Sequence, residues 1–231
     1  MVLFNQSPTL DTLMDTIKRN SVYLIRDKEH QKYFHRIIEA IRETDRRFFL
    51  DKPGFEYLDT ALPIEHGQTI SQPSTVVYML LKHPIESGMT VLEIGSGSGW
   101  NAALLSYLVD PGQVYSFEVI PDLTHKAKNN VENLMKHSQQ RHRYENIEFI
   151  TGNIFSEDFD DMPFFDRIII TAGIEEDKLE ILKEFAFNRL TENGKLICPQ
   201  REGPMYFIKK KDNELIITKS KDLFRFVPLI L

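Results

Sequence analysis

The chain has 231 residues, of which 42% are hydrophobic and 27% charged, and its formal net charge is -6 at pH 7. This composition is ordinary for a globular protein with a substantial core, and the net acidity argues against nonspecific nucleic-acid binding, which needs a basic surface. No apolar run approaches the roughly 18 residues that span a bilayer, and the N-terminus lacks the pattern of a signal peptide. One cysteine, Cys198, leaves no partner for an intramolecular disulfide and fits a reducing compartment. We therefore expect a cytoplasmic protein.

The first part of the chain is predicted to be helical. Apolar residues recur near helical spacing over residues 10–17 and 33–41. From residue 46 to 67, prolines and glycines interrupt the pattern and predict loops, with room for one short strand. A further helix is expected over residues 74–82.

From residue 90 onward, short apolar runs alternate with helical patterns. Strands are expected over residues 90–94, 113–119, 146–151, 166–171 and 195–199, and helices over 100–109, 122–136 and 176–190. The last helix is expected to stop at Asn193-Gly194. Two further strands, 205–210 and 214–219, are predicted to form a hairpin through Lys211-Asp212-Asn213, and the basic run Lys209-Lys210-Lys211 is expected to be a solvated face. The alternation predicts a mostly parallel sheet covered on both faces, with an antiparallel strand at or near one edge.

A glycine-rich turn, Gly95-Ser96-Gly97-Ser98-Gly99, lies between a predicted strand and a predicted helix. Glycines let a backbone approach a ligand closely, and a helix N-terminus presents free N–H groups. A dinucleotide fold favours a small residue where this chain has Trp100. The GxGxG pattern therefore suits S-adenosyl-L-methionine (AdoMet) better than a pyrophosphate. A tight turn without a ligand is the alternative.

Two further positions follow the next predicted strands. Glu118 ends one of them, where an acid can accept hydrogen bonds from both ribose hydroxyls of a nucleoside. Gly152-Asn153 ends another, and the amide oxygen of Asn153 could accept a hydrogen bond from an adenine amine. The alternatives are a solvated acid at Glu118 and an Asn-stabilised turn at Asn153.

The segment 62–73, LPIEHGQTISQP, closely resembles the signature LPIGHGQTISQP of the protein-L-isoaspartate O-methyltransferases. The resemblance continues through VLEIGSGSG, VYSFEV, FFDRIIITAG and NGKLICP to RFVPL, and covers roughly residues 35–231. DRRFF at 45–49 is similar to the family's VPRHRFV segment. The resemblance implies an α/β fold, the Rossmann-like fold of class I AdoMet methyltransferases. We expect one domain, with residues 1–75 as a helical extension and substrate segment and 76–231 as the AdoMet-binding core.

The resemblance also implies a reaction. The family transfers a methyl group from AdoMet to the free carboxyl of L-isoaspartyl residues in damaged proteins and releases S-adenosyl-L-homocysteine. The ester then cyclises to a succinimide, whose hydrolysis returns some normal aspartate. The family's catalytic hydroxyl falls on Ser71. Its cofactor positions fall on Gln68, Thr69, Ile70, Ser71, Gly95, Ser96, Gly97, Gly99, Glu118, Val119, Gly152 and Asn153. We expect a monomer that acts on damaged proteins or peptides, without a metal, a membrane or a nucleic acid as partner.

This chemistry needs no general base. An aspartyl-type carboxyl has a pKa near 4 and is already ionised at neutral pH, so the site must align the reactants and exclude water. His66 is therefore expected to be a hydrogen-bonded loop residue, and Ser71 to orient a carboxylate oxygen. The chain departs from the family at Glu65, where Gly is usual, and at Asn153, where Asp is usual.

Two alternatives remain open at this point. One is an AdoMet methyltransferase with another acceptor. Amino-group methyltransferases often carry an Asn/Asp-Pro-Pro-Tyr/Phe motif, but this chain has Ile170-Thr171-Ala172-Gly173 at that place. The other is an AdoMet-binding homologue with little or no turnover. Incubation with labelled AdoMet and an isoaspartyl peptide separates them.

Overall fold

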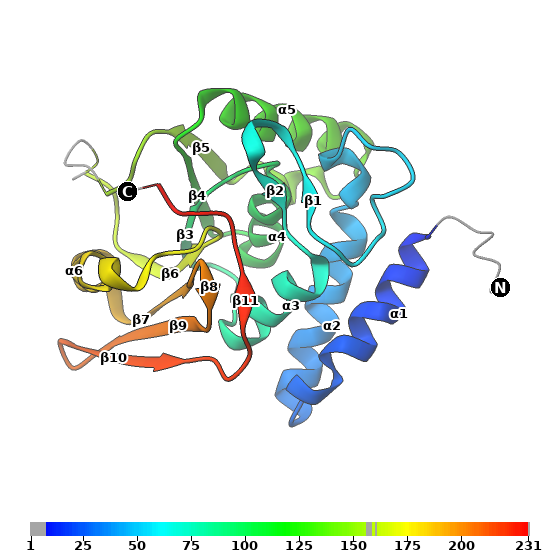
Figure 1. Ribbon diagram of the computed structural model, residues 1–231. Helices are drawn as coiled ribbons and strands as arrows, with labels where there is room; N and C mark the ends of the chain where they lie inside the picture. Colours follow the sequence, from blue (N-terminus) through cyan, green and yellow to red (C-terminus); the bar gives the residue numbers. More distant parts are fainter. Residues whose placement is uncertain (1–7, 156–158, 160, 231) are drawn as a thin grey trace.

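A seven-stranded sheet forms the centre of the computed structural model, in which residues 8–155, 159 and 161–230 are described (Figure 1). Five strands run parallel to one another: β3 (Thr90–Ile94), β4 (Gln113–Glu118), β5 (Ile147–Thr151), β6 (Phe165–Ile170) and β7 (Leu190–Pro199). The hairpin strands β9 (Met205–Lys211) and β10 (Glu214–Lys219) are antiparallel. The strand order is β10-β9-β7-β6-β3-β4-β5, so the antiparallel strand β10 lies at one edge, as predicted.

Helices cover both faces of the sheet. The α-helices are α1 (Leu10–Ser21), α2 (Lys28–Glu43), α3 (Pro73–Lys82), α4 (Trp100–Val109), α5 (Pro121–His137) and α6 (Leu179–Arg189). The 3-10 helices are η1 (Val22–Leu24), η2 (Arg46–Phe49), η3 (Glu65–Gly67), η4 (Arg141–Tyr144) and η6 (Glu176–Lys178). Two pairs of short strands lie outside the main sheet: β1 (Leu62–Pro63) with β2 (Thr69–Ile70), and β8 (Glu202–Gly203) with β11 (Phe224–Arg225).

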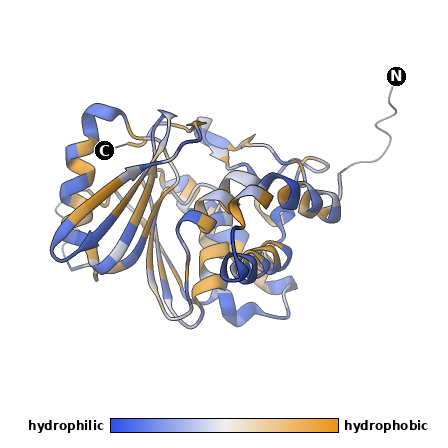
Figure 2. Ribbon diagram, turned by 90° about the horizontal axis from the view of Figure 1, so that it is seen from below, coloured by the Kyte–Doolittle hydropathy of each residue, from blue (hydrophilic) through white to orange (hydrophobic). Residues whose placement is uncertain are grey.

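Apolar residues from every layer form two cores. On one face, side chains of α1 to α5 pack with sheet residues such as Val91 and Ile197. On the other face, Leu182 and Phe185 of α6 pack with residues such as Ile168. Hydrophobic and hydrophilic residues are mixed along the same helices and strands (Figure 2), as expected of elements with one buried face.

The N-terminal helices share the core of the first face with the sheet. The expected boundary between residues 75 and 76 falls inside α3. Capping residues fix where these helices start: Thr9 and Thr12 form a capping box at α1, and the Asp27 side chain accepts a hydrogen bond from the His30 backbone at α2. Within the described ranges, no helix has both the length and the apolarity needed to cross a membrane.

One boundary differs from the prediction. The predicted helix 176–190 is a 3-10 turn followed by α6, which ends at Arg189, and Asn193-Gly194 does not stop it. Both residues lie inside β7 instead, where Asn193 has a φ of 66°. The pairing of β6 with β7 shifts there, from Phe165 opposite Leu190 to Arg167 opposite Lys195. The extra residues are accommodated as an irregularity of the strand, a tertiary feature that sequence periodicity does not encode.

Candidate active site

A pocket opens at the carboxyl ends of the parallel strands, the usual place for ligands in open α/β sheets. Counted out to its open mouth, it encloses about 820 Å³. The described residues that line it are 68–71, 94–98, 100, 101, 117–120, 152–154, 171, 172 and 227–230. All predicted site residues except Gly99 therefore come together here. Gly99 caps α4 with a φ of 86°, and a Cβ there would lie 2.9 Å from the Ala127 carbonyl oxygen, so this glycine permits α4 to approach α5.

The glycine loop is held against the ends of β4 and β6. The backbone N–H of Gly95 donates to the Phe117 carbonyl at 2.8 Å, and the Thr171 hydroxyl donates to the Gly95 carbonyl at 2.6 Å. A Cβ on Gly95 would lie only 2.4 Å from the Thr171 hydroxyl oxygen. Gly95 also has a φ of 99°, which L side chains rarely adopt. Glycine is thus required where the loop passes Thr171.

Glu118 is buried at the end of β4 and faces the pocket. One carboxylate oxygen accepts a hydrogen bond from the Gly97 N–H at 2.9 Å, and the other accepts from the Ile120 N–H at 3.2 Å. A carboxylate offers about four lone-pair positions, so acceptor capacity remains for a pair of ligand hydroxyls. The solvated-acid alternative is wrong, because Glu118 is only 7% exposed.

Asn153 also lines the pocket, at the end of β5. Its side-chain oxygen accepts a hydrogen bond from the Phe155 N–H at 3.0 Å, the geometry of an Asn-stabilised turn. The oxygen has a second lone pair, and the amide N–H₂ makes no hydrogen bond to another described residue. Turn formation and ligand contact are therefore compatible at this position.

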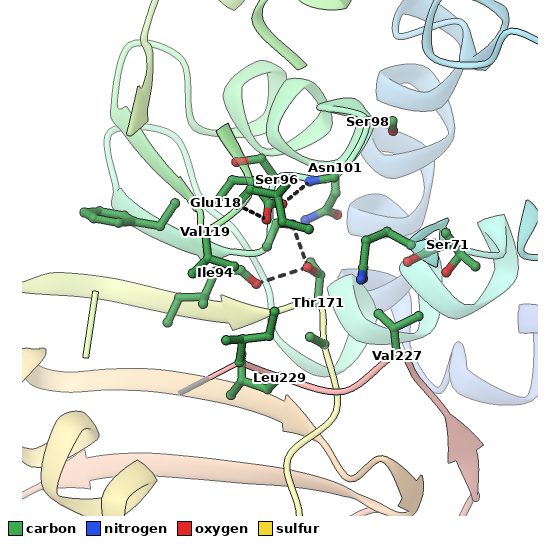
Figure 3. A pocket seen from close by; sticks show the side chains of 18 of the residues that line it. Ser71, Ile94, Ser96, Ser98, Asn101, Glu118, Val119, Thr171, Val227 and Leu229 are labelled. Carbon is green, nitrogen blue, oxygen red and sulfur yellow. Dashed lines mark hydrogen bonds between the residues drawn. The ribbon is translucent and has the colours of Figure 1, made fainter. Parts of the chain in front are cut away.

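Ser71 reaches the same pocket from a different part of the chain, the segment after β2. In Figure 3, Ser71 and Glu118 approach the pocket from different sides, with Thr171 between them in this view. The Ser71 backbone carbonyl accepts a hydrogen bond from Arg46 at 3.1 Å. Its hydroxyl has no hydrogen-bond partner among the described residues and so remains available to a ligand.

Arg46 fixes the whole segment that precedes Ser71. Its guanidinium is buried, with 1% of the residue exposed, and donates to the carbonyls of Glu56, Leu58 and Thr60 as well as to that of Ser71. It also lies over the Trp100 ring, 5.4 Å from the ring centroid. Burial lowers the pKa of Arg46 to about 10, and the charge of Asp59 opposes that shift. The guanidinium is thus still charged at neutral pH, and its hydrogen bonds hold four backbone carbonyls close together.

Side-chain contacts with α5 hold the tip of the same segment. Lys126 pairs with Glu65 at 2.9 Å and also with Asp51. His66 pairs through its Nε2 with Asp122 at 3.2 Å and does not line the pocket. His66 thus contacts α5 from outside the pocket, and Glu65, the departure from the family pattern, contributes to holding this segment in place.

Glu93 lies behind the pocket in a polar network. It is fully buried; its carboxyl accepts from the Asn101 amide at 2.7 Å and is bonded to the Ser116 hydroxyl at 2.5 Å. Ser116 in turn shares a hydrogen bond of 2.6 Å with Ser96. Burial raises the pKa of Glu93 to about 8, although the hydrogen bonds from Ser116 and Asn101 oppose that shift. The network orients Ser96 and Asn101, which line the pocket.

The prediction missed the C-terminal segment of the pocket. Residues 227–230 line it because Gly173 donates to the Val227 carbonyl at 2.7 Å and Leu229 donates to the Gly173 carbonyl at 2.8 Å. Thr171 was missed as well, although its place at the end of a predicted parallel strand marks it as a candidate. The RFVPL match at residues 225–229 marks the C-terminal segment but does not place it at the pocket, since about 55 residues separate it from its partner Gly173.

A family model described as Protein-L-isoaspartate(D-aspartate) O-methyltransferase (PCMT) matches residues 18–231. The chain belongs to this family. The protein-L-isoaspartate O-methyltransferase of Pyrococcus abyssi is 36% identical over 83% of this chain and 85% of its own length. That of Fervidobacterium nodosum is 34% identical over 87% of this chain and 98% of its own.

Solved structures agree with this membership. A putative member of the family from Plasmodium falciparum, in complex with S-adenosyl-L-homocysteine, superposes with a TM-score of 0.76 at 25% identity, covering 95% of this chain and 97% of its own. A second structure titled protein-L-isoaspartate O-methyltransferase has a TM-score of 0.75 at 30% identity and covers 95% of this chain. The predicted fold class, a Rossmann-like class I AdoMet methyltransferase, is confirmed.

Proposed function

We propose that this chain is a protein-L-isoaspartate O-methyltransferase that esterifies the free carboxyl of L-isoaspartyl residues in damaged proteins, with AdoMet as the methyl donor. The observation that carries the proposal is the placement of Ser71, within the signature segment 62–73, in the same pocket as the glycine loop and Glu118. Two segments far apart in the chain thus meet in one pocket. One supplies a hydroxyl for the substrate carboxylate, and the other supplies a site for the nucleoside of AdoMet.

The residues present fit AdoMet. Glu118 offers carboxylate acceptors to the ribose hydroxyls, and Gly97, at a φ of 51°, lines the pocket without a side chain. Residues 68–71 and Asn153 complete the proposed cofactor contacts. When bound, AdoMet supplies a methyl group on a positively charged sulfur. The apolar side chains of Ile94, Phe117, Val227 and Leu229 in the lining exclude water from the transfer.

Alignment, rather than proton transfer, is the task of this site. The acceptor carboxylate is ionised at neutral pH, and no base is required. The Ser71 hydroxyl donates to one carboxylate oxygen and directs the other toward the methyl group. Arg46 holds Ser71 through its backbone, so the position of the hydroxyl depends on the buried guanidinium.

The proposal also covers the partners, the location and the oligomeric state of the enzyme. Its partners are proteins or peptides with L-isoaspartyl residues, and neither a nucleic acid nor a membrane takes part. We place the protein in the cytoplasm and propose that it acts as a monomer. Residues 1–75 carry the substrate segment, and 76–231 carry most of the cofactor site.

The test uses two peptides that differ only at one residue, L-isoaspartate in one and normal L-aspartate in the other. Each is incubated with the protein and methyl-labelled AdoMet, and volatile methanol is measured after base treatment. We expect strong labelling of the isoaspartyl peptide and almost none of its twin, since misplacing the nucleophile by about 1 Å lowers the rate on the order of 100-fold. Equal labelling would point to another acceptor, and AdoMet binding without labelling would indicate a homologue without turnover.

A further inference from the structure

A second hollow lies on the sheet face that α1 to α5 cover elsewhere. Its walls come from η1, the end of α3, the strands β7, β9 and β10, and the segment 219–222. It encloses about 1440 Å³ out to its open mouth and shares no lining residue with the first pocket. We refer to it below as the basic groove.

Positive charge is concentrated in the basic groove, although the chain as a whole carries a net charge of -6. Its lining holds six basic residues and one acid: Arg26, Lys82, Lys195, Lys209, Lys219, Lys221 and Asp222. The Asp222 carboxylate accepts a hydrogen bond from the Tyr78 hydroxyl. Lys219 pairs with Glu176 at 3.3 Å. Within the described part of the chain, no carboxylate forms an ion pair with any of the other five.

Two of these lysines directly face each other. Lys195 of β7 and Lys209 of β9 are register partners across an antiparallel pair, and both are half-buried. Like charges placed directly opposite each other destabilise a sheet. Burial and the charges of Arg167 and Lys209 lower the pKa of Lys195. Of the lysine run expected to be a solvated face, Lys211 is exposed, whereas Lys209 and Lys210 are half-buried.

A buried histidine lies at the inner end of the groove. His83 ends α3, lines the groove and is only 1% exposed. Its ring is hydrogen-bonded to the Lys195 backbone, but its Nε2 is buried without a hydrogen-bond partner among the described residues. A buried polar atom without a partner is unfavourable unless a ligand or water satisfies it. Because the other ring nitrogen donates to the Lys195 backbone and the ring is neutral, this Nε2 is an acceptor, and the positive charge at the inner end of the groove comes from Lys195.

The remaining wall is apolar and in part aromatic. Phe207 and Ile216 lie on the same sheet face as Lys209, and Tyr23 of η1 lines the groove beside them. Tyr23 is 59% exposed and Ile216 is 50% exposed, although both are large hydrophobic side chains. Exposed apolar surface next to a polar cluster is typical of a ligand site.

We propose that the basic groove is a second binding site, for a small ligand that joins a polyphosphate-type anion to a flat apolar group, as a nucleoside polyphosphate does. The anion lies between Lys195 and Lys209, and the flat group lies against Tyr23, Phe207 and Ile216. An anion placed there relieves the repulsion between the facing lysines. The site is independent of methyl transfer.

The test is calorimetric titration of the whole chain with ATP, in the presence of saturating S-adenosyl-L-homocysteine, so that adenine cannot enter the first pocket. We expect one ATP per chain and an affinity that falls as salt is raised. ATP should bind more tightly than tripolyphosphate, and adenosine weakly. No binding of ATP would overturn the proposal, as would tighter binding of an oligoglutamate peptide, which would make the groove a peptide site. Equal affinity for ATP and tripolyphosphate would show that the flat group does not contribute to binding, contrary to the proposed ligand.

Matched variants locate the ATP. Lys195→Gln and Lys209→Gln should each weaken ATP binding about tenfold, as expected for loss of one charge-assisted contact, whereas Lys128→Gln, an exposed lysine on α5, should not. Without ATP, both groove variants should melt at a higher temperature than the unmodified chain, because one of the facing charges is gone. Methylation of the isoaspartyl peptide should be unchanged in Lys209→Gln. Equal weakening by Lys128→Gln would show that only the overall charge matters and would overturn the site.

Discussion

The guanidinium of Arg46 donates a hydrogen bond of 3.1 Å to the backbone carbonyl of Ser71, 25 residues further along the chain. The same group donates to Glu56, Leu58 and Thr60 and stacks over Trp100. One side chain therefore joins η2, the loop before β1 and the proposed substrate residue.

Replacing Arg46 should affect both stability and turnover. Arg46→Met leaves four carbonyls without their charged donor, and we expect a loss of about 3 kcal/mol or more in the free energy of unfolding, or roughly 6–12 °C in melting temperature. Arg46→Lys keeps the charge but lacks the planar fork that reaches several acceptors, so it should recover only part of this stability. At temperatures well below the melt, kcat should fall in both variants because Ser71 is no longer held. A full kcat in folded Arg46→Met would contradict the positioning role.

Ser71→Ala should lower turnover of the isoaspartyl peptide about 100-fold if the hydroxyl aligns the carboxylate during transfer. AdoMet affinity should remain nearly intact, because the glycine loop and Glu118 supply most of that binding. Ser71→Thr is the matched control, since it retains a hydroxyl and should retain most activity. Rate and affinity are measured on one preparation, with folding checked by thermal melt. Normal turnover in Ser71→Ala would exclude the hydroxyl from the reaction.

Glu118→Ala should weaken AdoMet binding about tenfold or more, a loss of roughly 1.5–3 kcal/mol if both ribose hydroxyls donate to the carboxylate. The structure adds a second reason, because the Gly97 N–H loses its acceptor and the glycine loop loses one of its supports. Calorimetry with AdoMet measures the change. Glu118→Gln keeps an oxygen acceptor and should be affected less. An unchanged affinity in Glu118→Ala would remove this residue from the cofactor site.

Asn153→Asp should keep or improve AdoMet affinity. A carboxylate retains the hydrogen bond to the Phe155 N–H and accepts more strongly from an adenine amine than an amide oxygen does. The measurement is AdoMet calorimetry on both proteins under the same salt conditions. A large loss of affinity would mean that the Asn153 amide donates a hydrogen bond to the ligand, contrary to the acceptor role.

Glu93 should make the fold less stable as the pH rises. Its pKa is about 8 in the folded chain against an ordinary value of 4.5, so between these pH values the folded chain holds a proton that the unfolded chain has lost. The free energy of unfolding then falls with increasing pH, by up to about 1.4 kcal/mol per pH unit, and this loss ends above pH 8. Glu93→Gln preserves the bonds to Asn101 and Ser116 without a titrating group. Between pH 5 and 8 its melting temperature should therefore fall less than that of the unmodified chain.

The control for this comparison is Glu148→Gln, an exposed carboxyl on β5 that should leave the pH dependence as it is. Thermal melts at pH 5, 6, 7 and 8 provide the data. Parallel curves for Glu93→Gln and the unmodified chain would show that burial of Glu93 does not control the pH dependence.

The sequence by itself determined the parts of this protein that depend on neighbours within a few residues. The bounds of β3 and α4, the glycine loop between them and the Asp212-Asn213 turn all follow from local periodicity and backbone preference. The signature around Ser71 and the acid at Glu118 likewise stand in continuous segments of sequence. The predictions of the fold, the cofactor and the reaction depended on these local features.

Tertiary structure alone decided which distant residues meet. Nothing near Arg46 in the sequence indicates that it is buried among four carbonyls, and nothing near Lys209 indicates that Lys195 faces it. Strand register determines the second relationship, and packing of η2 against the loop before β1 determines the first. The same holds for Val227 beside Gly173 and for Asn193 inside β7 instead of at a helix end. Such contacts depend on how whole elements dock, and their free energies come from burial and pairing between segments that local sequence preferences do not relate.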